Sequence, residues 1–129
     1  MKPYIPKNKS DEEFHLFLNK KKINEIREDV YLLLEWLQDI NWPVVKYVSA
    51  YLNEYTNEIA DDIIKVLNGT DEEWKYSIMH TLILNSNKKP NEFILNRIKK
   101  IYYSPTEEEK YAELVEIAED ILNKYDGSC

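Results

Sequence analysis

Apolar residues recur every three or four positions along most of this chain, a spacing that places side chains on one face of an α-helix. In residues 23–38, for example, Ile26, Val30, Leu33 and Leu37 share such a face. Comparable stripes predict seven helices, over 10–22, 23–38, 42–55, 58–67, 70–84, 92–103 and 104–125. No stretch sustains the period-two alternation of a β-strand. We therefore predict an all-α chain.

Three of these helices begin with a capping-box pattern, in which a hydroxyl and a carboxylate three residues later satisfy free backbone N–H groups. The pattern occurs in Ser10–Glu13 and in Thr70–Glu73. It recurs in Ser104–Glu107, where Pro105 takes the first helical position and its missing N–H costs nothing. We expect these residues to mark three helix starts.

The predicted helices form pairs, and the pairs repeat along the chain. A shift of 32 positions places Asp39 on Asp71 and Trp42 on Trp74, and a shift of 33 relates the second pair to a third. A repeat of this length is typical of an α-solenoid, whose helical hairpins bury their apolar faces against their neighbours. A heptad coiled coil is the alternative, and the short loops between helices disfavour it.

These patterns predict a single domain over residues 1–129. A flexible segment over 1–9 precedes a capping helix over 10–22, and three helical hairpins follow over 23–125. The expected architecture is an α–α superhelix of about seven helices.

The repeated residues lie where one helix of a hairpin turns into the next. Asp39 is expected to cap the second helix by accepting hydrogen bonds from its first N–H groups. Pro43 is expected in the first turn of that helix, where a proline is harmless. Trp42 and Trp74 are expected to fill the junction between hairpins, with a paired aromatic binding platform as the alternative. Together with Asp71, these residues form a predicted structural corner.

The corner also carries a resemblance. An aspartate at a helix end, a tight turn and an apolar helix resemble the corner within HEAT-like repeats. WLQDINWPV at 36–44, followed by DEEWKY at 71–76, resembles a small bacterial family of uncharacterised all-helical proteins. The resemblance covers residues 26–84. It implies a compact HEAT-like stack and carries no activity with it.

Composition excludes several classes of site. The two glycines, Gly69 and Gly127, are too far apart for a glycine-rich phosphate loop. Cys129 is the single cysteine, so no internal disulfide or multi-cysteine metal site can form, and we expect it to be incidental. The first residues are polar and no apolar run approaches the length of a membrane span. We expect a soluble cytoplasmic protein that does not associate with membranes.

The net charge of −7 is unevenly distributed. Residues 1–27 hold seven Lys/Arg against four acids, whereas residues 28–129 hold ten against twenty. A nucleic-acid-binding protein needs cations that neutralise phosphates, so the acidic main body argues against that class. It suits a basic protein partner, or serves solubility alone.

Candidate catalytic chemistry is sparse. Glu35 and Asp39 lie four residues apart on one helix face, as paired acid–base groups or half of a metal site would. An enzyme would need them to converge with a residue such as His80. No Ser/His/Asp or Cys/His pattern is present. We predict no enzymatic activity, no metal and no cofactor.

A tyrosine stripe is the strongest candidate for an interface. Tyr47, Tyr51 and Tyr55 recur at four-residue spacing, and tyrosine is favoured at interfaces because it combines an apolar body with a polar tip. The stripe equally fits the wet edge of a helix stack. We assign a partner-binding face to Tyr47, Tyr51, Tyr55, Glu54, Glu58 and Trp36.

These observations predict a small protein-binding module, an adaptor or a toxin-immunity-like protein, that acts through an acidic, tyrosine-rich face on a basic protein partner. The alternatives are an enzyme of unknown reaction that uses Glu35 and Asp39, and a purely structural scaffold. The sequence leaves the oligomeric state open.

Overall fold

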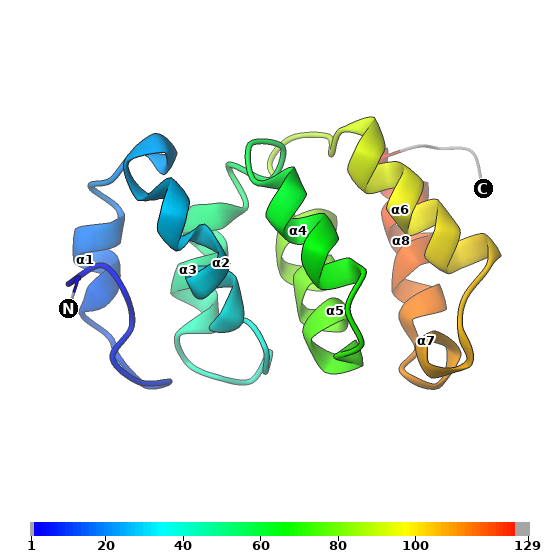
Figure 1. Ribbon diagram of the computed structural model, residues 1–129, viewed down its shortest axis with the longest axis horizontal. Helices are drawn as coiled ribbons and strands as arrows, with labels where there is room; N and C mark the ends of the chain where they lie inside the picture. The colour runs from blue at the N-terminus through cyan, green and yellow to red at the C-terminus, as the bar shows by residue number, and fades with distance from the viewer. Residues whose placement is uncertain (1, 126–129) are drawn as a thin grey trace.

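The computed structural model describes residues 2–125, and in this part of the chain the regular secondary structure is entirely helical, with no β-strand. The predicted all-α class is confirmed, whereas Cys129 lies outside the described residues. The elements are α1 (Phe14–Leu18), the 3₁₀-helix η1 (Ile23–Asp29), α2 (Val30–Glu35), α3 (Val45–Leu52), α4 (Ala60–Leu67), α5 (Glu72–Ile78), the π-helix η2 (Met79–Leu84), α6 (Glu92–Tyr103), α7 (Glu107–Tyr111) and α8 (Leu114–Tyr125) (Figure 1).

Three predicted helices are divided, among them that over 70–84, which is α5 followed by η2. Because α7 and α8 replace one predicted helix, residues 2–125 contain eight α-helices instead of about seven in the whole chain. The expected helix over 23–38 is η1 followed by α2, because Ile26 leaves the helical region with φ −120° and ψ 18°. The expected helix over 104–125 breaks into α7 and α8. Glu113 stands between them in the left-handed region, with φ 63°.

The helices form two layers in an elongated row (Figure 1). One layer holds α2, α4 and α6, which contact one another in that order. The other holds α1, α3, η2 and α8, again in contact from one to the next. The chain advances along the row from α1 towards α6 and α8, so each part of the molecule packs mainly against its neighbours in sequence.

Buried apolar side chains form one cluster between the layers. Burying a side chain of this size contributes about 1.5–3 kcal/mol relative to leaving it in water. The largest fully buried side chains are those of Phe14, Leu18, Ile26, Leu33, Leu34, Leu37, Leu52, Ile59, Ile63, Leu67, Ile78 and Met79.

The first residues pack onto this core, in contrast to the flexible segment expected over 1–9. Tyr4 and Ile5 are buried. Asp29 accepts a hydrogen bond from the Tyr4 hydroxyl and forms an ion pair with Lys2 at 2.8 Å. Hydrogen bonds from Lys2 and then Tyr4 lower the pKa of the Asp29 carboxyl. Tyr4 and Ile5 are therefore held against the core, and the ion pair between Lys2 and Asp29 fixes the segment beside them.

Each of the three predicted helix starts is displaced. At α1, Asp11 takes the place of Ser10 and accepts hydrogen bonds from the N–H of Glu13 and of Phe14 at 2.9 and 3.3 Å. At α5 the cap is Asp71, whose carboxylate accepts from the Trp74 N–H at 3.1 Å. A carboxylate is a strong acceptor at a helix N-terminus, where the helix dipole also favours it.

The third start moves because its predicted cap has another role. Ser104 ends α6, where its N–H donates to the Lys100 carbonyl at 2.9 Å. The capping box forms two residues later. Thr106 Oγ1 accepts from the Glu109 N–H at 3.1 Å, and Glu109 Oε1 accepts from the Thr106 N–H at 2.8 Å.

Candidate functional site

The corner after α2 brings two of the three tryptophans together. Trp36 caps the C-terminus of α2, and its ring meets that of Trp42 edge-on, with centroids 5.9 Å apart and planes at 60°. Asp39 Oδ1 accepts from the Asn41 N–H at 2.9 Å. Asp39 thus caps the turn, and Pro43 lies in this turn instead of in the first turn of α3, which begins at residue 45. Both tryptophans stay half-buried.

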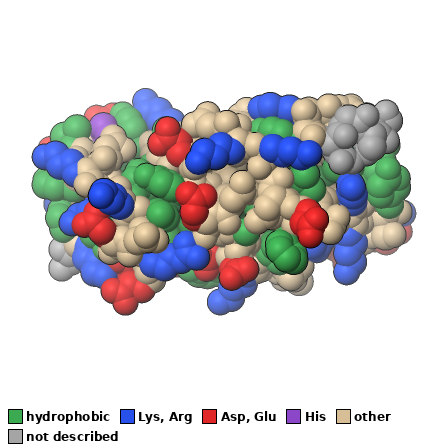
Figure 2. All heavy atoms as spheres, turned by 90° about the horizontal axis from the view of Figure 1, so that it is seen from above, with side chains coloured by type: hydrophobic (Ala, Val, Ile, Leu, Met, Phe, Trp, Pro, Cys, Tyr) green, Lys and Arg blue, Asp and Glu red, His purple; other side chains and the backbone are tan. Residues whose placement is uncertain are grey.

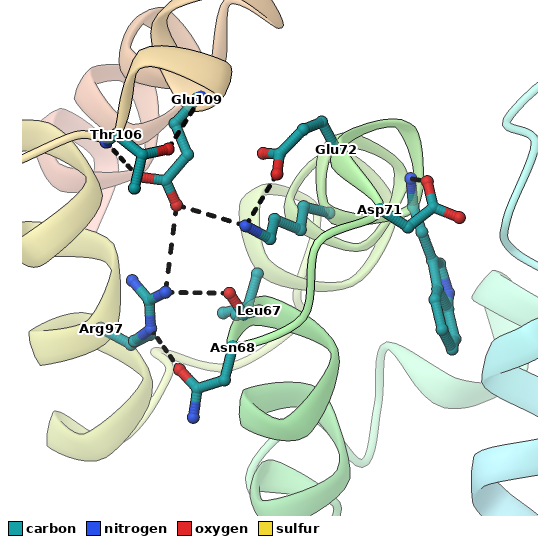
Figure 3. Close-up of polar contacts among 9 residues, drawn as sticks. Leu67, Asn68, Asp71, Glu72, Arg97, Thr106 and Glu109 are labelled. Carbon is teal, nitrogen blue, oxygen red and sulfur yellow. Dashed lines mark hydrogen bonds and ion pairs between the residues drawn. The ribbon is translucent and has the colours of Figure 1, made fainter.

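Trp74, the repeat equivalent of Trp42, has a different environment. It is buried, and its indole N–H donates to the Leu34 carbonyl at 2.8 Å. Its ring also packs edge-on against Tyr31 at 5.7 Å. Trp74 therefore links the start of α5 to the end of α2, while Asp71 holds its backbone (Figure 3). Of the two tryptophans that the 32-residue shift aligns, Trp74 is therefore inside the fold and Trp42 is half-buried at its surface.

The tyrosine stripe lies mostly against the protein itself. Tyr51 is buried, its hydroxyl donates to the Lys21 carbonyl at 2.8 Å, and burial raises the pKa of this hydroxyl to about 12. Tyr47 is half-buried and stacks on His15 at 4.0 Å. Tyr55 is half-buried against Tyr51, with centroids 5.3 Å apart. The sequence-predicted face is therefore contiguous, yet its central residue is not accessible.

The acidic members of that face, Glu54 and Glu58, are exposed. They lie between α3 and α4, and Asn53 next to Glu54 lines a hollow on the surface. This hollow belongs to a more extended depression on the layer of α3, η2 and α8.

Three adjoining hollows make up this depression, which we term the acidic groove. The first, of about 480 Å³, lies between α3 and η2. The second, of about 600 Å³, lies between the corner at 38–41 and the start of α5. The third, of about 200 Å³, lies between η2 and α8. They adjoin one another, since Ile40 lines the first two, Tyr76 the last two, and His80 the first and third.

Two backbone irregularities shape the groove. Its floor is η2, a π-helical turn, a feature that is rare and frequent at functional sites. Its far wall includes Glu113, whose left-handed φ of 63° is unusual for a residue other than glycine. On η2, His80 stacks on Tyr76 with centroids 6.1 Å apart. The two irregular backbone segments therefore meet at one hollow, in which His80 of η2 and Glu113 are both lining residues.

The groove is strongly negative. Its only lysine or arginine is Lys46. Glu72 is paired with Lys75 at 3.1 Å, whereas none of the other lining carboxylates forms an ion pair within residues 2–125. The acidic lining residues are Asp39, Glu72, Glu73, Glu113, Glu116 and Asp120.

The residues named for an enzymatic alternative lie in separate hollows. Asp39 lines the second hollow of the groove and His80 the first and third. Glu35 lines a fourth hollow beside Trp36 and Trp42. Across the described residues, no group of three His, Cys, Asp or Glu side chains is placed to hold a metal ion.

Sequence reasoning missed a buried charge cluster at the other face of α5 (Figure 3). Lys75 is almost fully buried, and its ammonium lies 3.1 Å from Glu72 Oε1 and 3.4 Å from Glu109 Oε2. Arg97 Nη2 lies 3.9 Å from the same Glu109 oxygen and donates to the Leu67 carbonyl at 2.9 Å. Lysine and glutamate are almost never fully buried unless paired, so only their pairing explains these positions.

The face seen from above the row carries charges of both signs, unlike the lining of the acidic groove (Figure 2). Lysine and arginine side chains are interspersed with acidic and neutral ones, and no continuous basic band crosses this face. A phosphate backbone needs such a band. In the described part of the chain, no helix is long and apolar enough to cross a membrane.

Comparison with known proteins identifies a family. A family model described as a domain of unknown function, DUF5071, matches residues 4–122. A search of curated proteins found no match.

Proposed function

The chain belongs to the DUF5071 family, and we propose that it is a protein-binding module whose acidic groove receives a basic segment of a protein partner. The proposal rests on the three adjoining hollows on the layer of α3, η2 and α8. Five of their carboxylates have no ion-pair partner within residues 2–125. Carboxylates left without cations attract a cationic partner and fix its register.

The shape of the groove favours an extended segment. Its hollows follow one another across three helices, which suits a chain that presents several side chains in succession. Tyr76, Trp42 and His80 add ring faces between the acids. A guanidinium can stack on an aromatic ring while it donates to a carboxylate, so arginine suits this lining better than lysine.

We also propose a finer description of the fold and of its role. The two layers of consecutive helices support a short HEAT-like α–α superhelix. An adaptor or a toxin-immunity-like protein in the cytoplasm, which occludes a basic partner, is the role that fits this charge and shape. The tyrosine stripe then supports α3, one wall of the groove.

Fluorescence anisotropy with a labelled nine-residue peptide of alternating arginine and alanine tests the proposal. The groove variant carries Glu73→Gln, Glu116→Gln and Asp120→Asn. The matched control carries Glu54→Gln, Glu58→Gln and Glu92→Gln, which change the net charge equally at exposed positions outside the groove. We expect the groove variant to bind roughly 10-fold more weakly, since each close charge contributes about 0.5 kcal/mol.

The control is expected to lose less than about 2-fold, because none of its three residues lines the groove and exposed charges are screened at physiological salt. Equal losses in the two triple variants would show that the peptide senses only net charge. A larger loss in the control would move the interface to the face around Glu54 and Glu58.

A further inference from the structure

A fourth hollow, separate in chemistry from the acidic groove, lies at the corner after α2. Its volume is about 260 Å³, and it is lined by Leu32, Glu35, Trp36, Gln38 and Trp42. No lysine, arginine or histidine lines it. Leu32 is 42% exposed, a large value for a leucine beside two indoles. The site therefore combines apolar walls with one carboxylate.

The two indoles supply ring faces that meet at an angle. Trp36 and Trp42 form an edge-to-face pair with centroids 5.9 Å apart and planes at 60°, so a group beside this contact lies over the face of one indole and close to the other ring. Tryptophan binds cations over its ring more strongly than tyrosine or phenylalanine. Two such walls and a nearby carboxylate form the arrangement that recognises organic cations.

The protein's own cations leave these indoles open. Four lysines, Lys21, Lys46, Lys65 and Lys124, stand over tyrosine rings at 4.6–5.9 Å. Over residues 2–125, no lysine or arginine stands over Trp36 or Trp42. Glu35 likewise forms no ion pair in this part of the chain. The strongest cation-binding rings and an adjacent carboxylate are thus both without an internal cation.

We propose that this hollow binds a quaternary ammonium group, with Trp36 and Trp42 as the ring walls and Glu35 as the counter-charge. A primary ammonium carries three strongly hydrated N–H donors, and packing it against the two indoles and Leu32 removes water from them. A quaternary ammonium has no donors to satisfy, and its methyl groups pack against Leu32 and the indoles. The proposal does not depend on the function of the acidic groove.

Nuclear magnetic resonance of the full chain labelled with ¹⁵N tests the site through its three indole N–H signals. The Trp74 N–H is bonded to the Leu34 carbonyl inside the fold and serves as an internal reference. Choline is titrated as the probe, and 3,3-dimethyl-1-butanol, in which carbon replaces the charged nitrogen, is its neutral control. We expect saturable shifts of the Trp36 and Trp42 signals with choline, and binding of the neutral analogue at least about 10-fold weaker.

Two variants distinguish the contribution of the Glu35 charge to binding from that of the indole rings. Glu35→Gln is expected to weaken choline binding roughly 3- to 10-fold, whereas Glu54→Gln, which removes the same charge elsewhere, leaves it unchanged. Trp42→Ala is expected to abolish the shift of the Trp36 signal. An unchanged Trp74 signal in each variant shows that the fold is intact.

A peptide with trimethyl-lysine and the same peptide with unmodified lysine distinguish the source of the ammonium. Tighter binding of the trimethylated peptide than of choline identifies a modified protein as the ligand, and the reverse identifies a small molecule. The proposal is overturned if the neutral alcohol binds as tightly as choline, if unmodified lysine matches trimethyl-lysine, or if the Trp36 and Trp42 signals do not move.

Discussion

Tyr51 illustrates how a single hydroxyl joins separate parts of this chain. Its ring lies in the core, and its hydroxyl donates to a carbonyl thirty residues earlier, just after α1. Burial raises the pKa of this hydroxyl to about 12, because the phenolate would lose its hydration without gaining a positive partner. The neutral form of Tyr51 is therefore favoured by the folded state.

This shift makes stability depend on pH in the alkaline range. The folded pKa of about 12 lies above the value of 10.0 for an unperturbed tyrosine, so between these values the unfolded chain releases a proton that the folded chain keeps. The contribution of Tyr51 is present below pH 10 and declines as the pH rises. In urea unfolding from pH 8 to 11.5, we expect the free energy of unfolding to fall more steeply for the wild type than for Tyr51→Phe.

At neutral pH the same variant is expected to lose about 1 kcal/mol, the contribution of one hydrogen bond. Tyr55→Phe is the control, since its half-buried ring keeps the packing next to Tyr51. Parallel pH curves for the wild type and Tyr51→Phe would contradict the shifted pKa.

The spacing of tyrosines along α3 predicts that they share a face, but it does not predict what covers that face. What covers the face is α1, through Phe14 and His15 against Tyr47. Which helix lies over a stripe depends on three-dimensional packing between segments far apart in sequence. The burial of Tyr51 could therefore not be read from its four-residue spacing, although its hydrogen-bonding hydroxyl is typical of a buried tyrosine.

At the scale of elements, the buried cluster of Lys75, Glu109 and Arg97 connects α5, α7 and α6. The Glu109 carboxylate has two roles, since it pairs with Lys75 and also completes the capping box of α7 with Thr106. Removing one partner of a buried ion pair leaves an uncompensated charge, which costs more than the pair contributes when intact.

A double-mutant cycle measures this coupling. Lys75→Met is expected to destabilise the fold by roughly 3 kcal/mol, because it removes the nearer of the two cations at buried Glu109 and also the cation paired with Glu72. Glu109→Gln preserves the capping hydrogen bond while removing the charge, and is expected to cost about 2 kcal/mol. The double variant is expected to fall short of the sum by on the order of 1 kcal/mol, as measured by urea unfolding.

The exposed pair Lys110 and Glu107, 3.3 Å apart, provides the matched cycle. Lys110→Met and Glu107→Gln are each expected to change the free energy of unfolding by less than about 0.5 kcal/mol, with little coupling between them. Additive effects at Lys75 and Glu109 would show that the buried cluster is not energetically coupled.

Helices were predictable from periodicity, whereas their ends were not. The first residues of the capping patterns, Ser10, Thr70 and Ser104, lie one to three residues before the N-caps observed at Glu13, Asp71 and Thr106. The break at Glu113 carries no sequence signal, because glutamate is not a residue that favours a left-handed backbone. Lys75 likewise resembles a surface lysine until Glu109, 34 residues later, is folded beside it.

At the scale of the whole molecule, the row of helices implies graded stability. Helix α1 lies at one end of its layer and packs against α3, and its Leu16 and Phe17 side chains are 58% and 46% exposed. By contrast, η2 contacts α3, α5 and α8. Stability in such a stack depends on interfaces between neighbours, so an end helix with one neighbour opens most easily.

Native-state hydrogen exchange tests this gradient. We expect amides of α1 to exchange through openings at least about 2 kcal/mol lower in free energy than those of η2, with a weaker dependence on urea. Equal opening free energies and urea slopes for α1 and η2 would instead show that the row unfolds as one unit.

The acidic groove itself emerges only at this scale. Its carboxylates come from the corner after α2, from α5 and from the beginning of α8, positions separated by tens of residues. The acidic balance of residues 28–129 gives only the net charge of that part of the chain. It contains no information on which acids converge, since that depends on how the hairpins stack.

The π-helical turn of η2 has a further consequence for the groove. Together α5 and η2 form one unbroken rod over 72–84, and a π-turn holds one residue more than an α-turn. Loss of one residue within η2 would close the π-turn to an ordinary α-turn and keep the segments on either side of it in phase. The side chains inside the turn would change direction, His80 among them. The position of His80 in the groove therefore depends on the number of residues in this turn, and a one-residue deletion would move it while leaving every charged side chain in the sequence.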